Sequence, residues 1–291
     1  MAVKITAVAK QLPKYTRETK DILPYVELWL NGQEERFKRK VLKIFENAAV
    51  DKRYSIMSPE AVFLKTSFEE KNDIYVRECV ELSEKCLNKV LNKADLKPTD
   101  IDYIITVSCT GIMIPSLDAY LINSLRMKQD IVRDGCASVI LSSYEDEVGP
   151  EIKDEDMYHF FDATHMMGFK LRNTGLQMVL DQTVPQTIAD HFPKIIHPFL
   201  EKNNLTIEAI NHLVFHPGGK KIVQTVEDLF GALGKNIDDT KEVLRLYGNM
   251  SSATVLYVLE RFMDRDIPKG DKGIMLSFGP GFSAQRILLE W

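Results

Sequence analysis

Two stretches of this chain repeat one plan, and this internal repeat restricts the possible folds more than any other feature. Residues 99–111, T-D-I-D-Y-I-I-T-V-S-C-T-G, resemble residues 207–219, I-E-A-I-N-H-L-V-F-H-P-G-G. Each reads as a loop, an apolar strand and a glycine turn that leads into a helix. Residues 134–143 resemble residues 272–279 in the same way. We therefore predict an α/β protein of two pseudo-symmetric halves in five α/β/α/β/α layers, with the halves at residues 1–150 and 151–291.

The two copies differ in length at one place. In the second copy, a helical segment that includes Asn249 to Met263 lies between the two strands, whereas the first copy passes directly from Arg133 to Asp134. A parallel crossover needs a dozen or more residues and usually a helix. Comparison of the spacings predicts that about 30 residues or more of the first repeat are missing at this junction.

Composition excludes several classes of protein. The formal net charge of −5 argues against general binding of nucleic acid. The four cysteines have no C-x-x-C spacing, so no disulfide or zinc framework is expected. No apolar run is long enough to span a membrane, and the N-terminus has no signal-peptide core. A cytoplasmic protein is therefore the expectation.

Two segments are assigned from composition and pattern. The acidic residues 145–156 are predicted to be a connector. Gly175 to His197 has helical periodicity and is predicted to be a helix.

Two polar residues are candidates for chemistry. His216 follows the apolar strand Leu213 to Phe215, and an imidazole at the end of a buried strand suits acid–base catalysis or hydrogen-bond donation. The alternative is a surface loop histidine. Asn249 lies in Y-G-N-M-S-S-A, where it could act beside His216 or simply cap the following helix.

Six stretches, spread over nearly the whole chain, resemble the type III polyketide synthases, the chalcone synthase-like branch of the thiolase superfamily. They are C-T-G-I-M-I-P-S-L-D (109–118), D-G-C-A-S-V-I-L (134–141), M-G-F-K-L-R-N-T-G-L-Q-M-V-L (167–180), H-P-G-G (216–219), Y-G-N-M-S-S-A-T-V-L (247–256) and F-G-P-G-F (278–282). The sequences of residues 109–118 and 167–180 are more similar to those of bacterial members of the family than to those of plant members. The resemblance implies a thiolase-like fold.

The resemblance also implies a Cys–His–Asn triad. His216 matches its histidine and Asn249 its asparagine. The family's nucleophilic cysteine lies in a segment that should follow Arg133 and that this sequence lacks. Cys136 lies in a similar G-C-A turn, but Asp134 and the strand after it match a later G-D-G motif of the family, so we do not assign it as the nucleophile.

The implied reaction starts when a cysteine thiolate takes an acyl group from an acyl-CoA starter. Malonyl-CoA then loses carbon dioxide, and the resulting carbanion attacks the bound acyl group. His216 and Asn249 would activate the thiolate and stabilise the enolate oxygen. No metal or redox cofactor is required. The residues expected to contact substrate are Cys109, Met178, Gly279, Pro280 and Gly281 in the cavity, with Lys40 and Lys43 of the basic segment near the CoA phosphates.

Two other functions remain open. A ketoacyl-ACP synthase III-like enzyme would use the same His and Asn with acyl carrier protein. A catalytically dead, CoA-binding protein of the thiolase fold would result if the gap after Arg133 is a real deletion. The family resemblance further implies a homodimer, with Met113 and Ile114 near the partner's cavity.

Overall fold

The structure is a computed structural model that describes residues 2–64, 67–108, 111–127, 132–133, 138–144, 146–173 and 175–291. The first half contains β1 (Val3–Ala9), β2 (Tyr15–Glu18), α1 (Thr19–Trp29), α2 (Glu35–Glu46), β3 (Lys52–Ser55), α3 (Pro59–Leu64), α4 (Phe68–Lys93), β4 (Tyr103–Ile104), α5 (Leu117–Ser124), β5 (Val132–Arg133) and β6 (Ser138–Ser142). The second half contains β7 (Glu151–His159), β8 (Met167–Arg172), β9 (Gly175–Leu180), α6 (Val184–Lys202), β10 (His212–Phe215), α7 (Lys220–Gly231), α8 (Asp238–Tyr247), α9 (Ala253–Met263), β11 (Lys272–Gly279) and β12 (Ser283–Glu290).

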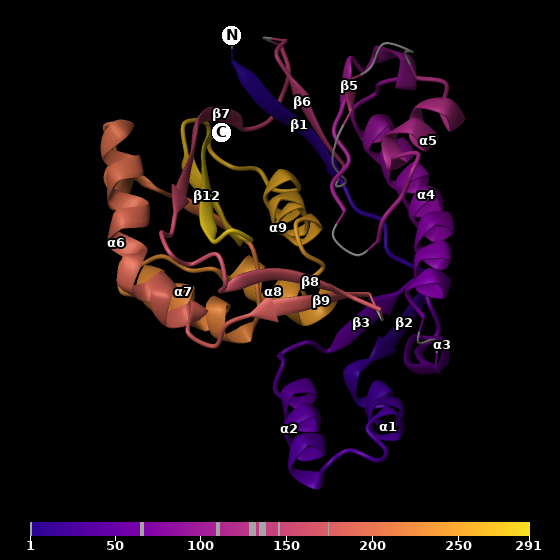
Figure 1. Cartoon of the computed structure of the whole chain (residues 1–291). Helices are drawn as coiled ribbons and strands as arrows, with labels where there is room; N and C mark the ends of the chain where they lie inside the picture. The colour runs from indigo at the N-terminus through magenta and orange to yellow at the C-terminus, as the bar shows by residue number, and fades with distance from the viewer. Residues whose placement is uncertain are drawn as a thin grey trace.

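One curled sheet of six strands runs through both halves in the order β10-β11-β12-β7-β1-β6 (Figure 1). β10 and β11 are parallel, and every other neighbouring pair in this sheet is antiparallel. β4 and β5 form a separate parallel pair. β7 and β1, the first strands of the two halves, meet at the pseudo-symmetric centre of the sheet.

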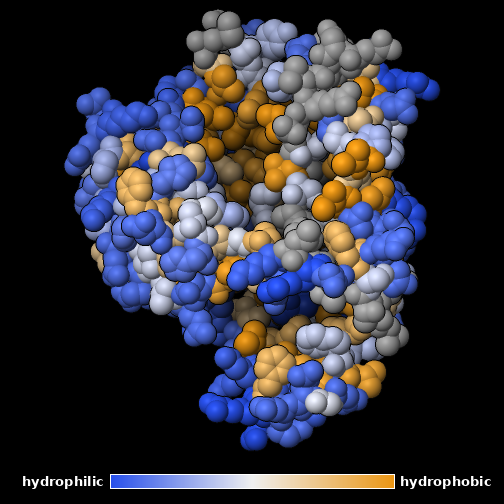
Figure 2. Space-filling view, viewed as in Figure 1, coloured by the Kyte–Doolittle hydropathy of each residue, from blue (hydrophilic) through white to orange (hydrophobic). Residues whose placement is uncertain are grey.

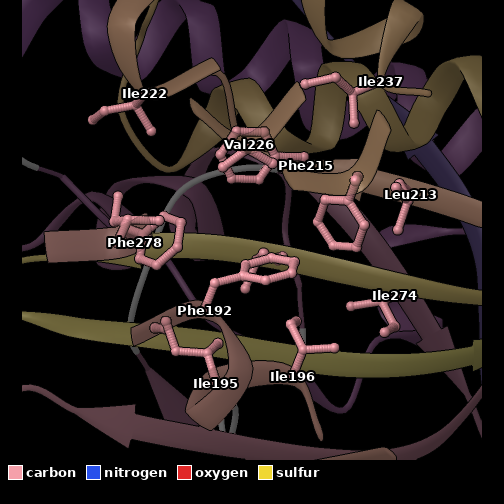
Figure 3. Close-up of a cluster of buried hydrophobic side chains, with 14 of the residues drawn as sticks. Phe192, Ile195, Ile196, Leu213, Phe215, Ile222, Val226, Ile237, Ile274 and Phe278 are labelled. Atoms are coloured by element: carbon pink, nitrogen blue, oxygen red, sulfur yellow. The ribbon is translucent and has the colours of Figure 1, made fainter. Parts of the chain in front are cut away.

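The buried side chains divide the molecule into the predicted layers. On one outer side, α6 and α7 pack on β10 and β11 through a large cluster that includes Phe192, Phe215 and Val226 (Figure 3). In the middle, α9 packs between β1 and the second-half strands, with Val258 beside Val8 and Val214. On the other outer side, α4 packs on β1 and β6 through clusters that include Val90, Leu91 and Ile140. The predicted mixed α/β architecture in five layers is confirmed.

The first pair of repeated stretches corresponds as predicted. β4 and β10 each follow a long helix, α4 or α6, and a short 3-10 turn, Pro98–Asp100 or Ile207–Ala209. The second pairing was wrong. β6 pairs antiparallel with β1 just as β12 pairs antiparallel with β7, so β6 corresponds to β12 and not to β11. Short apolar strands of similar composition cannot be told apart without their neighbours in the sheet.

Two predicted segments also differ from the structure. Residues 151–156 of the expected connector belong to β7, whose acidic side chains have basic partners: Lys202 lies 2.9 Å from Asp154, and Arg286 lies 3.4 Å from Asp156. The expected helix from Gly175 begins only at Val184, because β9 first pairs with β8 in a hairpin. In both cases strand pairing overrides a local preference. None of the helices in the described ranges has the length and apolar character needed to cross a membrane.

Candidate active site

His216 lies where β10 leaves the sheet. Val214 belongs to the middle cluster and Phe215 to the outer cluster, so both faces of the strand are covered. The backbone N–H of His216 donates to the carbonyl of Leu276 on β11 at 2.9 Å. The side chain is only 8 % exposed. The structure thus has His216 buried at the end of the strand, and the alternative of a surface loop histidine is wrong.

Burial decides the charge of this imidazole. It lowers the pKa of His216 to about 4, because a charged ring would lose its hydration with no compensating partner. Within the described part of the chain, its Nδ1 atom is buried and has no hydrogen-bond partner. His216 is therefore a neutral imidazole near pH 7. In that state one ring nitrogen is a donor and the other is an acceptor.

Asn249 reaches the turn that follows His216. Its Nδ2 donates to the carbonyl of Gly218 at 2.9 Å, and its Oδ1 accepts the backbone N–H of Ser251 at 2.8 Å. The helix cap is a different residue, because α9 begins at Ala253 and Ser252 occupies the N-cap position. Asn249 is therefore not the helix cap, and its side chain links its own loop to the His216 turn.

Residues from distant parts of the sequence hold these two loops. Arg245, at the end of α8, lies 2.7 Å from the Asp51 carboxylate, and its carbonyl accepts the Asp51 N–H at 2.9 Å. Val50 packs against Gly248, beside Asn249. The buried Thr240 hydroxyl donates to the carbonyl of Phe215 at 2.9 Å. These supporting contacts could not be predicted from the sequence, because positions 51 and 245 have no local pattern that links them.

Gly279, Pro280 and Gly281 lie in the hairpin between β11 and β12. Gly279 ends β11 and pairs with Ser283 across the hairpin. Since β10 and β11 are parallel, this turn and His216 lie at the same edge of the sheet. The turn extends three residues beyond Leu276, which is about 10 Å along the strand. It therefore borders the space in front of His216 from one side.

The other predicted substrate residues lie elsewhere or outside the described ranges. Met178, on β9 opposite Phe169, is 60 % exposed. Lys40 and Lys43 are exposed on α2, which with α1 forms the lobe at the bottom of Figure 1. Cys109 lies outside the described residues. No hydrogen bond or ion pair that the structure describes joins Met178, Lys40 or Lys43 to His216 or Asn249.

The cysteines that the structure describes are not placed as nucleophiles. Cys79 and Cys86 are both on α4, in the outer layer of the first half. Burial raises the pKa of the Cys86 thiol, which disfavours the thiolate. Cys136 and the junction at Asp134 lie outside the described residues. β5 ends at Arg133, and β6 begins at Ser138.

Comparison with known proteins shows what this chain is similar to. The family described as chalcone and stilbene synthases, C-terminal domain, matches residues 157–290, which include both His216 and Asn249. A phloroglucinol synthase from Pseudomonas fluorescens is 23% identical over 308 residues, covering 86% of this chain and 88% of that protein. The resemblance to the type III polyketide synthases is confirmed. The fold is shared with a solved structure: the crystal structure of 1,3,6,8-tetrahydroxynaphthalene synthase from Streptomyces coelicolor, a bacterial type III polyketide synthase, superposes with a TM-score of 0.89 at 21% identity, covering 99% of both chains.

The alignment with one of these polyketide synthases also measures a difference in length. A 1,3,6,8-tetrahydroxynaphthalene synthase from Streptomyces peucetius is 24% identical, covering 99% of this chain and 93% of that protein. The alignment extends over 351 positions, whereas this chain has 291 residues, so at least 60 positions have no counterpart here.

Proposed function

We propose that this chain is a condensing enzyme of the type III polyketide synthase class, and that His216 and Asn249 carry the decarboxylation of malonyl-CoA. The observation that supports this most directly is the hydrogen bond from Asn249 to Gly218, two residues after His216. It ties both side chains to one turn at the edge of the sheet. The matched chalcone and stilbene synthase domain supports the same reaction class.

The hydrogen-bonding capacity of the two side chains suits this step. Loss of carbon dioxide from malonyl-CoA leaves negative charge on the thioester oxygen, and fixed donors stabilise such charge. The Asn249 amide has two N–H groups, of which one is used for Gly218. The neutral His216 ring has one N–H to donate. Together they can supply two hydrogen bonds to an enolate oxygen.

The coenzyme A part of the substrate is proposed to bind along α2. This helix carries Lys40 and Lys43 as well as other exposed cations, and clustered cations bind phosphates well. Its C-terminal end leads within a few residues to Val50 and Asp51, which hold the Asn249 loop. A CoA thioester on α2 could therefore extend toward that loop.

Extension of a starter needs, in addition, a thiol to hold the acyl group. We propose that this thiol belongs to the segment that has no counterpart in the chain, so that the protein condenses malonyl units onto a starter when this segment is present and only forms acetyl-CoA from malonyl-CoA when it is absent. Intact mass of the expressed protein decides whether the segment is present. We further propose a cytoplasmic homodimer that uses CoA thioesters and needs no metal or redox cofactor.

Asn249→Asp tests the proposal, because aspartate retains the Oδ1 acceptor for Ser251 and removes the amide donor. We expect acetyl-CoA formation from malonyl-CoA to fall about 100-fold, the usual cost of losing one such donor. Asn236→Asp is the control, since Asn236 is exposed and its Oδ1 also accepts a backbone N–H, from Asp238. Unchanged turnover in Asn249→Asp, at an unchanged melting temperature, would refute the role of Asn249.

The acyl carrier protein alternative is tested with the same assay. Malonyl-CoA and malonyl-ACP are offered separately to the protein, and carbon dioxide release is measured. Release from malonyl-CoA is expected. Release from malonyl-ACP alone would instead assign the chain to the ketoacyl-ACP synthase III-like class, and release from neither would favour a CoA-binding protein without catalysis.

A further inference from the structure

A slot separates β4 from β6 in the first half. Its volume is about 740 Å³, and residues 101–106 line one side while residues 138–143 line the other. Helix α4 closes the floor with Ser83, Leu87 and Val90. Nearby, apolar residues line a hollow in the upper middle of Figure 2, between β7 and β12 on one side and β1 and β6 on the other. The first half is thus open in a place where the second half is packed.

Both walls of the slot are strand edges. β6 is the last strand of the six-stranded sheet, and β4 pairs with β5 alone among the described strands. Each therefore has one row of backbone N–H and C=O groups with no strand beside it in the described ranges. Such edges are templates for pairing with another chain.

The second half shows what fills the equivalent place. There, β11 lies between β10 and β12, parallel to the first and antiparallel to the second. β4 corresponds to β10 and β6 to β12, so the slot is the pseudo-symmetric position of β11. Helix α9 precedes β11 in the chain and fills the middle layer. The described part of the first half has no counterpart of either α9 or β11.

The size and the lining of the slot fit a strand. At ordinary sheet spacings a residue of a packed strand takes up about 160 Å³, so five residues need on the order of 800 Å³. Ile104 and Ile140 are buried on the α4 side, whereas Ile105 and Leu141 are 63 % and 53 % exposed on the other side. A strand between them would have apolar neighbours on both of its faces. Strands of that kind are themselves apolar almost throughout.

We propose that this slot binds, by strand addition, an apolar extended segment of about five residues from another polypeptide, parallel to β4 and antiparallel to β6. The length comparison agrees with this, because at least 60 aligned positions have no counterpart in this chain, which is more than a strand of about five residues requires. The proposal rests on the sheet alone and does not depend on the catalytic assignment.

A peptide with the sequence of β11, residues 272–279, is the probe, because β11 occupies the equivalent position. Fluorescence anisotropy of the labelled peptide with the full chain is expected to show saturable binding. Hydrogen exchange is expected to slow in residues 103–106 and 138–142 when the peptide is bound. The control peptide carries Met275→Pro and so lacks one backbone N–H. Every N–H of an inserted strand would donate a hydrogen bond to β4 or to β6, so this peptide would lose one of these bonds. We expect it to bind at least tenfold more weakly.

Two protein variants locate the binding site. Ile105→Asp puts a charge beside the inserted strand and is expected to weaken the peptide at least tenfold. Leu28→Asp is the matched control, since Leu28 is 61 % exposed on α1, and it is expected to bind the peptide like the unchanged protein.

Four results of the peptide experiments would overturn the proposal. They are no saturable binding, equal binding of the proline peptide, equal loss in both protein variants, and displacement of the peptide by decanoate, which would make the slot a site for acyl chains. A dimer of the unliganded chain that protects residues 103–106 and 138–142 from exchange would assign the slot to a second copy and would also overturn it.

Discussion

His216 gives the chain a pH dependence of stability that can be measured at a single residue. Its pKa of about 4 in the folded state lies below the ordinary value of 6.5, so between these values the unfolded chain binds more protons than the folded chain. Stability must therefore fall as the pH falls through this window. The contribution of His216 is about 2 kcal/mol between pH 7 and pH 5. In His216→Gln this part of the loss should disappear, as measured by urea unfolding at both pH values.

His165→Gln is the control for this experiment, because His165 is exposed on the surface. It should retain the full loss of stability between pH 7 and pH 5. An equal loss in His216→Gln would contradict the buried neutral imidazole and with it the donor role proposed for this ring.

Single residues of the candidate site could be predicted where the chain itself carries the signal. An apolar strand followed by H-P-G-G identifies a strand end, and the structure has His216 there. The partnership with Asn249 followed from family order, and the bond to Gly218 adds its geometry. Arg245 and Asp51 are 194 residues apart in the sequence, so no local sequence pattern could predict their contact. The family resemblance assigned a sequence position to Met178, but its location in the structure could not be predicted from the sequence.

At the scale of elements, the turn that leads into β7 depends on one glycine. Gly149 has φ of +138°, and a Cβ atom there would lie 2.0 Å from the carbonyl oxygen of Ile5 in β1. A backbone atom in a paired strand cannot move away cheaply. Gly149→Ala should therefore destabilise the protein by about 3 kcal/mol, since strained backbone and a steric clash add.

Gly234→Ala separates these two causes. Gly234 also has a positive φ, +71°, but nothing lies within 4 Å of the position that a Cβ atom would take there, so only the backbone cost of about 1 kcal/mol is expected. Thermal unfolding of both variants checks the difference. Equal destabilisation would show that the contact with Ile5 costs nothing.

Elements with strong periodicity were predicted better than those decided by their neighbours. The strand before His216 follows from its apolar pattern. β7 was missed because its acidic residues resemble a loop until Lys202 and Arg286 are placed beside them. The equivalence of β6 to β12 could not be predicted from the apolar sequence of β6, because it is defined by the antiparallel pairing of β6 with β1.

At the scale of the whole molecule, the repeat predicted the layered α/β fold, because two similar units must bury the same kind of sheet. The repeat also predicted where the halves differ. The structure adds what a spacing comparison could not supply: the two strand edges that face each other across the slot, and the hollow beside α9. A sequence pattern indicates which helices and strands are present. Only the packing of the structure shows which surfaces stay uncovered when a helix or strand is absent.

The halves are also joined by a buried ion cluster, and its loss should weaken the whole molecule. Glu260 of α9, whose side chain is 7% exposed, lies 2.7 Å from Lys10 after β1 and 3.1 Å from Lys93 of α4. Burial alone would raise the pKa of Glu260, but hydrogen bonds and charge from the two lysines more than offset it, and the pKa lies below its ordinary value. This carboxylate therefore stabilises the fold above about pH 4, and the contribution is lost as the pH falls through its folded pKa.

Glu260→Gln should lower the free energy of unfolding at pH 7 by about 2 kcal/mol, since removal of one partner of a buried pair is costly and the partly exposed lysines reduce that cost. Glu81→Gln is the matched control, because Glu81 pairs with Lys85 on the surface of α4 with both side chains more than half exposed. Its effect should stay within about 0.5 kcal/mol. Urea unfolding at pH 7 and near pH 3 measures both variants, and the cost of Glu260→Gln should shrink at the lower pH because the native carboxylate is then becoming protonated. A cost that is equal at both pH values would mean that Glu260 stabilises the contact between the halves by packing and not by its charge.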